Sequence, residues 1–111
     1  MISGLYAITG GNKDGRLVER VQAVLRGGAA MVQYREKDLS EEERVAVAKK
    51  LKKLCQDSGA LFIVNDSPAV ALASDADGVH LGQHDMGITE ARAILGPEKI
   101  IGVSTRTLDL A

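Results

Sequence analysis

The chain alternates between short apolar runs and amphipathic stretches, and this alternation restricts its fold more than any other pattern in the sequence. Apolar runs that we predict as strands cover residues 5–8, 29–34, 61–64, 78–81 and 100–103. Helical spacing of apolar residues predicts helices over residues 16–26, between Ser40 and Gly59, and over residues 68–73 and 89–95. Such alternation is typical of a parallel sheet with right-handed crossovers. We therefore predict an α/β fold of parallel βα units in a single domain.

The second predicted helix has its own start signal. Ser40 and Glu43 form a capping box, and Gly59 is suited to end the helix. We expect its buried stripe to comprise Val47, Leu51 and Leu54. Its lysines are interpreted as a solvated face rather than a phosphate site: Lys49, Lys50, Lys52 and Lys53.

The composition excludes several classes of protein. Lysine and arginine number 14 against 15 aspartates and glutamates, and the formal net charge of −1 gives no bulk attraction to nucleic acid or membranes. Aromatic residues make up 3% of the chain, so a stacking surface for single-stranded nucleic acid is not expected. The single Cys55 forms no internal disulfide, and we see neither a signal peptide nor a membrane-spanning run. We expect a cytoplasmic protein.

Polar clusters follow four of the predicted strands. They occupy residues 33–38 (QYREKD), 65–66 (ND), 82–85 (GQHD) and 104–107 (STRT). Because parallel strands point the same way, their C-terminal ends gather at one face, where α/β proteins keep their ligands. Cationic and carboxylate side chains would therefore meet there, which predicts a site for a metal-bound anion.

The number of units fits two folds. A closed eight-stranded βα barrel needs about 200 residues or more, so this chain would supply about half of one. Its first and fifth strands would then be unpaired edges. Thr107 begins a helical turn with no room to continue, and we interpret the end at Ala111 as a cut. Five βα units also make a complete flavodoxin-like sheet, and periodicity alone leaves both folds open.

Four segments in register closely resemble the N-terminal half of the thiamine phosphate synthase family. They are residues 32–39 (VQYREKDL), 63–66 (IVND), 75–85 (DADGVHLGQHD) and 101–105 (IGVST), and the resemblance runs from about Leu5 to Ala111. It implies a TIM barrel, of which residues 1–111 hold the first five strands. It also implies an enzyme of thiamine biosynthesis that joins hydroxymethylpyrimidine diphosphate to thiazole phosphate and releases pyrophosphate.

The resemblance also implies a metal and an anion site. Asp66 and Asp85 match the positions that hold Mg²⁺, an ion that takes hard carboxylate oxygens. Arg35 and Lys37 match contacts to the pyrophosphate, and we expect both to act in catalysis by stabilising this leaving group.

Three further positions match substrate contacts by the same resemblance. Gln33 and Asn65 match contacts to the pyrimidine and the diphosphate, and Ser104 matches a catalytic hydroxyl facing the reacting diphosphate. Alternation along a strand supports part of this assignment, because it places Gln33 and Arg35 on one face.

Each assignment has a structural alternative. Arg35 and Lys37 lie beside acidic residues and are also compatible with exposed ion pairs in a loop. Asn65 and Asp66 precede Pro68 and could cap the short helix that begins there, and Asp85 could cap the next one. His80 lies in an apolar strand, and we interpret it as a hydrogen-bonded structural residue.

Two features depart from the family pattern. Arg106 occupies a stretch where the family usually has a histidine, which argues against the related thiazole tautomerase. The threonine-rich loop and glycine-rich phosphate site of the family would lie beyond Ala111, so we expect this chain alone to be inactive. The alternatives are a non-catalytic half-barrel that binds pyrophosphate or assembles with another chain, such as a second copy in a homo-oligomer, and a tautomerase or regulatory paralogue.

Overall fold

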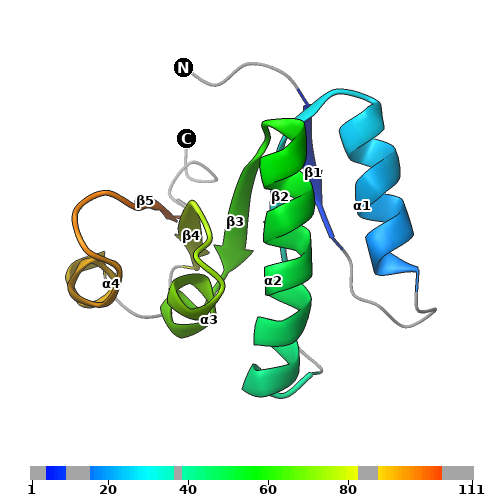
Figure 1. Cartoon of the computed structure of the whole chain (residues 1–111). Coiled ribbons are helices and arrows are strands. Elements are labelled where there is room, and N and C mark those ends of the chain that lie inside the picture. The colour runs from blue at the N-terminus through cyan, green and yellow to red at the C-terminus, as the bar shows by residue number, and fades with distance from the viewer. Residues whose placement is uncertain (1–4, 10–15, 37–38, 83–87, 104–111) are drawn as a thin grey trace, which may run out of the picture.

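Strands and helices alternate along the whole of the chain that the computed structural model describes, namely residues 5–9, 16–36, 39–82 and 88–103. The elements are β1 (Leu5–Ile8), α1 (Leu17–Arg26), β2 (Ala29–Tyr34), α2 (Glu41–Ser58), β3 (Leu61–Asn65), α3 (Pro68–Ala73), β4 (Gly78–Leu81), α4 (Ile88–Leu95) and β5 (Ile100–Val103) (Figure 1). The predicted order of elements is confirmed, and every predicted boundary agrees to within one residue.

The five strands form one parallel sheet in the order β1-β2-β3-β4-β5. A flavodoxin-like sheet has the order 2-1-3-4-5 instead, so the flavodoxin-like alternative is wrong. Sequential order is what a βα barrel requires, because each crossover then places the next strand beside the last. Within the described residues, β1 and β5 each pair on one side only, as expected for part of a barrel.

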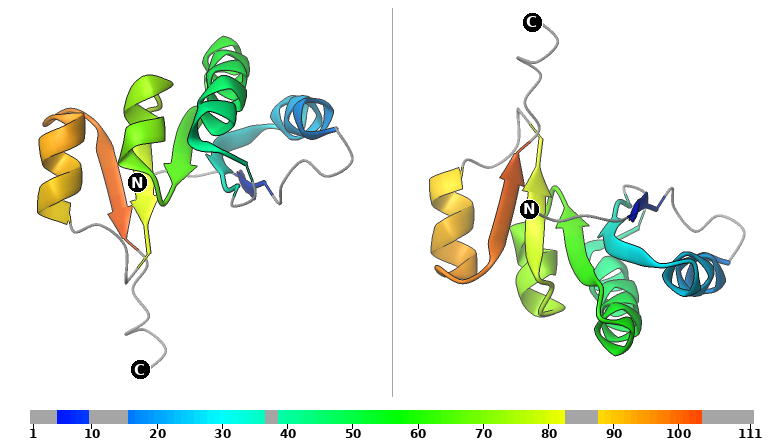
Figure 2. Two further views of the ribbon diagram at one scale, coloured as in Figure 1. Left: turned by 90° about the horizontal axis from the view of Figure 1, so that it is seen from below. Right: turned by 90° about the horizontal axis from the view of Figure 1, so that it is seen from above.

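The sheet is curved, and the four helices lie on its convex side (Figure 2). Alternation along the strands sends one set of side chains toward these helices, where they are buried with residues of α1, α2 and α3: Val32, Tyr34, Phe62, Val64, Val79 and Leu81. The intervening residues Gln33, Asn65 and His80 belong to the other, concave face and are half-buried. The core therefore lies between sheet and helices, and the polar positions face away from it.

Helix α2 confirms its predicted start but corrects its predicted stripe. The Ser40 hydroxyl accepts from the Glu43 N–H, and the Glu43 carboxylate accepts from the Ser40 N–H, both at 3.2 Å. The fully buried residues are Ala48, Leu51 and Cys55, whereas Val47 and Leu54 are only half-buried at the sides of the stripe. Small side chains at 48 and 55 suit the close approach of the helix to the sheet.

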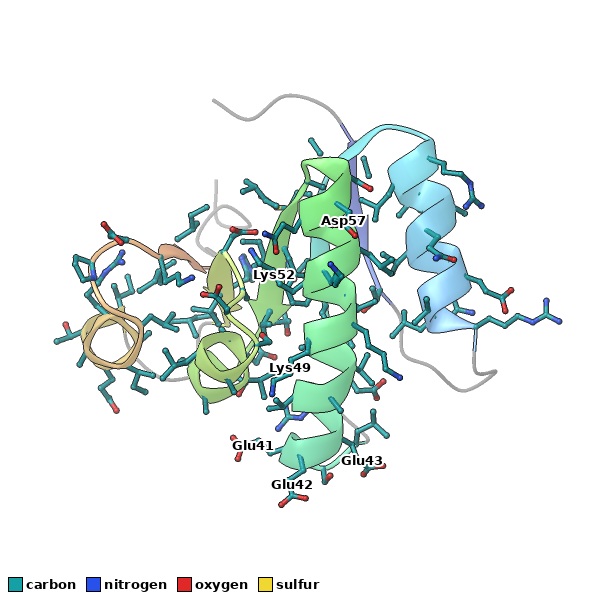
Figure 3. The ribbon with its side chains drawn as sticks, in the orientation of Figure 1. Glu41, Glu42, Glu43, Lys49, Lys52 and Asp57 are labelled. Atoms are coloured by element: carbon teal, nitrogen blue, oxygen red, sulfur yellow. The ribbon has the colours of Figure 1, made fainter. Side chains whose placement is uncertain are left out.

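The lysines of α2 do not form one solvated face. Lys49, Lys50 and Lys53 are exposed as predicted. Lys52 differs, because its side chain is 18% exposed and its ammonium lies 3.1 Å from a carboxylate oxygen of Asp77. Figure 3 shows the long helix with Glu41, Glu42 and Glu43 around its N-terminal end, where acidic side chains complement the helix dipole.

Two glycines are required by backbone geometry. Gly59 ends α2 with φ of 74°, a left-handed conformation that glycine adopts without steric cost. A Cβ at Gly78 would collide with the backbone oxygen of Ile100, its register partner in β5. None of the described helices is both long and apolar enough to cross a membrane.

Candidate functional site

Two polar side chains from neighbouring strands meet on the concave face, near the C-terminal ends of the strands. Gln33 lies near the end of β2 and Asn65 is the last residue of β3. The Nδ2 atom of Asn65 lies 2.8 Å from the Oε1 atom of Gln33. Parallel pairing of β2 with β3 produces this contact, which agrees with the predicted convergence of these residues at one edge of the sheet.

Asp66 follows directly and is held in an uncommon backbone conformation. Its φ is 66°, in the left-handed region that aspartate and asparagine tolerate better than most residues. Its N–H donates to the carbonyl oxygen of His80 at 2.8 Å, which extends the pairing of β3 with β4. This bond holds the Asp66 main chain at the same edge of the sheet as Gln33 and Asn65.

The Asn65 amide lies between Gln33 and Asp66. With the Asn65 amide turned over, its nitrogen lies 2.7 Å from one oxygen of Asp66 and 3.2 Å from the other. Its oxygen then lies 2.8 Å from the end of the Gln33 side chain, which donates through its amide nitrogen when Gln33 is turned over as well. A primary amide can donate and accept at once, so one side chain bridges the two neighbours. Gln33, Asn65 and Asp66 form a connected cluster, which we call the edge triad.

The capping alternative for Asn65 and Asp66 is wrong. The N-cap of α3 is Ser67, whose hydroxyl accepts from the Val70 N–H at 3.1 Å, and Pro68 occupies the first helical position. The Asp66 side chain is therefore not needed to start this helix. Its position beside an amide cluster at the sheet edge is a different environment from a helix cap.

Arg35 follows β2 with an exposed side chain. No ion pair in the described part of the chain involves Arg35. Its main chain is tied to Thr9: the Arg35 N–H donates to the Thr9 hydroxyl at 3.0 Å. Thr9 was not among the predicted site residues. The available signal was its place, since it is a polar residue at the C-terminal end of a predicted strand.

Three of the predicted site residues lie outside the described residues: Lys37, Asp85 and Ser104. The capping alternative for Asp85 and the role of Arg106 lie outside them as well. Among the described site residues, Gln33, Asn65 and Asp66 lie together in the edge triad. Arg35 follows directly after β2, the strand that carries Gln33.

His80 lies on the same face as the edge triad. It pairs with Asn65 in the register of β3 and β4, and with Gly102 in that of β4 and β5. A Cβ at Gly102 would lie 3.1 Å from the His80 Nδ1 atom, so the missing side chain leaves room for the imidazole. The interpretation of His80 as a structural residue stays a prediction.

Among the residues that the structure describes, two groups with a clearly raised pKa lie on the helix side of the sheet. Burial raises the pKa of Tyr34 to about 12, with the Glu36 charge adding to the effect and Arg44 opposing it. Burial also raises the pKa of the Cys55 thiol to about 11, with Asp77 adding and Lys52 opposing. Both groups stay protonated in the core at neutral pH, so we assign them to packing rather than to chemistry.

The side-chain oxygens of the edge triad suit a cation that is also bound by ligands from outside the protein. Within the described ranges no three histidines, cysteines, aspartates or glutamates are grouped closely enough to hold a metal ion by themselves. Mg²⁺ is commonly bound by one or two carboxylates together with substrate phosphates. The Asp66 carboxylate beside the Asn65 amide fits a binding mode of that kind.

Residues 5–111 match the protein family described as thiamine monophosphate synthase. The thiamine-phosphate synthase of Nostoc sp. is 50% identical over 96% of this chain, which covers 30% of that protein. The corresponding protein of Thioalkalivibrio sulfidiphilus is 50% identical over 99% of this chain and 54% of its own length. The chain thus spans between about a third and about half of these relatives.

A solved structure gives the same result for the fold. The thiamine phosphate pyrophosphorylase from Pyrococcus furiosus superposes with a TM-score of 0.83 at 44% sequence identity. The match covers 95% of this chain and 51% of that one. The predicted fold, βα units that form part of a TIM barrel, is confirmed.

Proposed function

The chain belongs to the thiamine monophosphate synthase family, and we propose that it carries the diphosphate-binding half of a thiamine phosphate synthase site. The proposed reaction joins hydroxymethylpyrimidine diphosphate to thiazole phosphate and releases pyrophosphate. We propose residues 1–111 as the N-terminal part of one (βα)8-barrel domain. The edge triad is the observation that carries the proposal, because it brings an amide pair and a carboxylate to the face where such barrels bind ligands.

Arg35 and Lys37 would bind the departing diphosphate. When the C–O bond to the diphosphate breaks, negative charge grows on the leaving group and positive charge on the pyrimidinylmethyl carbon. A guanidinium can bind phosphate oxygens as a two-pronged donor, and an ammonium binds them as a point charge. The exposed position of the Arg35 side chain beyond β2 supports this role. Stabilising and positioning the leaving group is then the main contribution to catalysis.

Asp66 and Asp85 would hold Mg²⁺, which when bound neutralises diphosphate charge. The backbone of Asp66 supports this role, because its N–H bond to the His80 carbonyl fixes the residue at the sheet edge. Asn65 orients the carboxylate from its other side. Because Ser67 rather than Asp66 caps α3, the Asp66 carboxylate can bind a cation without the loss of a capping hydrogen bond.

Gln33, Asn65 and Ser104 would contact the substrates directly. Amide groups suit a pyrimidine ring because they can both donate to ring nitrogens and accept from an amino group. Gln33 and Asn65 already orient one another at 2.8 Å, so little conformational entropy remains to be lost when a ligand binds. Ser104 would face the reacting diphosphate. The thiazole phosphate pocket would require further parts of the barrel, so we expect little or no turnover by this chain alone.

The proposal is tested by titrating Mg²⁺-pyrophosphate into the chain by calorimetry, with circular dichroism to confirm folding. Arg35→Ala should weaken binding by about tenfold or more, because charged hydrogen bonds contribute about 1.5–3 kcal/mol each. Asp66→Asn is preferred to an alanine variant, since asparagine also tolerates a positive φ and the substitution removes only the charge. It should abolish the Mg²⁺ dependence.

Asp75→Asn is the matched control. Asp75 is the other described non-glycine residue with a positive φ, 54°, and it lies before β4, at the opposite end of the sheet. This variant should bind Mg²⁺-pyrophosphate like the unaltered chain. Saturable binding that is unchanged in both Arg35→Ala and Asp66→Asn would contradict the assigned residues. A folded chain without any binding would contradict the proposal of a preformed diphosphate half-site.

A second candidate function is assembly through the open edges of the sheet. Within the described residues β1 and β5 pair on one side only, and unpaired edges are ready templates for another chain. We propose homo-oligomerisation of a cytoplasmic protein as the form this would take. Sedimentation equilibrium measures it directly, and a monomer at all concentrations would rule out this alternative.

A further inference from the structure

Thr9 makes three hydrogen bonds to β2 and the residue that follows it. Its backbone N–H donates to the Gln33 carbonyl at 3.0 Å. Its hydroxyl accepts from the Arg35 N–H at 3.0 Å and donates to the Arg35 carbonyl at 3.4 Å. The residue is 8% exposed. One buried side chain therefore holds both polar groups of the Arg35 backbone.

The hydroxyl takes the place of a main-chain acceptor. Regular pairing of β1 with β2 ends at Ile8 and Gln33. In a parallel ladder the next bond would run from the Arg35 N–H to the Thr9 carbonyl. The Thr9 side chain accepts this bond instead, so the connection between the two chain segments continues beyond the regular strands.

We propose that Thr9 is a positioning residue for diphosphate binding, acting through Arg35. This inference rests on the proposed function, which assigns the Arg35 guanidinium to the diphosphate. The guanidinium is exposed at the end of a long side chain, and its direction depends on where its backbone is held. Thr9 fixes that backbone from the first strand, and through the Gln33 carbonyl it also holds the strand that carries Gln33.

Two substitutions separate hydrogen bonding from packing. Thr9→Val keeps the branched shape of the side chain but removes both hydroxyl bonds, and Thr9→Ser keeps the hydroxyl while removing a methyl group. Ser74→Ala is a matched control, because Ser74 is also buried and its hydroxyl donates to the Val70 carbonyl at 2.8 Å, away from the edge triad. Urea unfolding would measure the stability of each variant.

The first measurement uses NMR to monitor amide hydrogen exchange at Arg35, and it needs no ligand. We expect the Arg35 N–H to be protected in the unaltered chain and in Thr9→Ser, and to lose about tenfold of that protection in Thr9→Val, where the partner is gone. Equal exchange rates at Arg35 in the unaltered chain and in Thr9→Val would overturn the anchoring role.

The second measurement is calorimetry with Mg²⁺-pyrophosphate. Thr9→Val should weaken binding about tenfold, Thr9→Ser should restore it, and Ser74→Ala should leave it unchanged. Combined with Arg35→Ala, Thr9→Val should have no further effect, because the side chain that it positions is absent. Faster exchange of the Arg35 N–H in Thr9→Val, together with unchanged binding of Mg²⁺-pyrophosphate, would overturn the inference. If the unaltered chain binds no pyrophosphate, the proposed half-site and the role of Thr9 in diphosphate binding are both refuted. The exchange rates at Arg35 would then test only whether Thr9 anchors the Arg35 backbone.

Discussion

The side chains of Gln33 and Asn65 lie 2.8 Å apart although 32 positions separate them in the sequence. Their contact joins β2 to β3 on the concave face, and Asn65 extends it to Asp66. Three polar groups thus orient one another where the proposed substrate would bind. Hydrogen-bonded networks of this kind are expected to show energetic coupling between their members.

Coupling between these two residues can be measured by a double-mutant cycle. We expect Gln33→Ala and Asn65→Ala to be less destabilising together than the sum of their separate effects, by about 0.5–1 kcal/mol, because either one alone breaks the same hydrogen bond. Urea unfolding of the two single variants and the double variant measures this coupling energy. Strict additivity would show that the contact contributes nothing to the folded state.

Asp77 is expected to stabilise the sheet at the end opposite the edge triad. One carboxylate oxygen accepts from the Phe62 N–H at 2.7 Å and the other from the Lys52 ammonium at 3.1 Å. Asp77→Ala leaves the Phe62 N–H without this acceptor and should lower the free energy of unfolding by about 1–3 kcal/mol. Chemical denaturation measures this change.

Two conservative variants provide controls for the Asp77 prediction. Asp77→Asn keeps an oxygen for the Phe62 N–H and should cost less than Asp77→Ala, because it loses only the charge of a pair whose side chains are 18% and 28% exposed. Asp57→Asn breaks an exposed pair with Lys53 at 3.8 Å and should be nearly neutral. Equal losses of unfolding free energy in Asp77→Ala and Asp77→Asn would show that the charge of Asp77, rather than its hydrogen bond with the Phe62 N–H, accounts for the effect.

Tyr34→Phe should leave stability unchanged or raise it at neutral pH. The Tyr34 hydroxyl is buried without a hydrogen-bond partner among the described residues, and removing an unpaired polar group relieves a desolvation cost. The ring would keep its stacking on Phe62, whose centroid lies 6.4 Å away. A loss of more than about 1 kcal/mol on urea unfolding would indicate that a water or another group pairs with the hydroxyl.

The same variant should change the pH dependence of stability in alkali. The folded pKa of Tyr34 is raised to about 12, above the value of about 10 for the unfolded chain. The folded state therefore holds this proton more tightly, and stability is lost as pH rises from about 10 to about 12. The difference between the unaltered chain and Tyr34→Phe should reach about 1–2 kcal/mol in this window. A pH-independent difference would contradict the raised pKa.

Cys55 should resist thiol reagents in the folded state. It is fully buried in α2 and its thiol pKa is raised to about 11, whereas reaction requires an accessible thiolate. We expect no modification by an aromatic disulfide reagent within minutes at about pH 8, and complete modification in denaturant. Rapid labelling under native conditions would mean that α2 opens readily from the sheet.

Local patterns in the sequence predicted most of the fold. Apolar runs located all five strands, and the Ser40 capping box located the start of α2. The stripe of α2 was less well predicted, because Ala48 and Cys55 are small and gave weaker signals than Val47 and Leu54. Lys52 was wrongly grouped with its solvated neighbours, since its partner Asp77 is 25 residues away.

The amino-acid sequence was sufficient to predict which elements form and in what order, because capping, helical spacing and apolar runs act over a few residues. It also placed the chain in its family through segments in register. Tertiary structure was needed to distinguish a barrel from a flavodoxin-like sheet, because strand order depends on pairings between distant segments. It likewise replaced Asp66 with Ser67 as the helix cap and brought the Thr9 hydroxyl to the Arg35 backbone. These contacts arise only when separate strands become neighbours, and no local pattern specifies them.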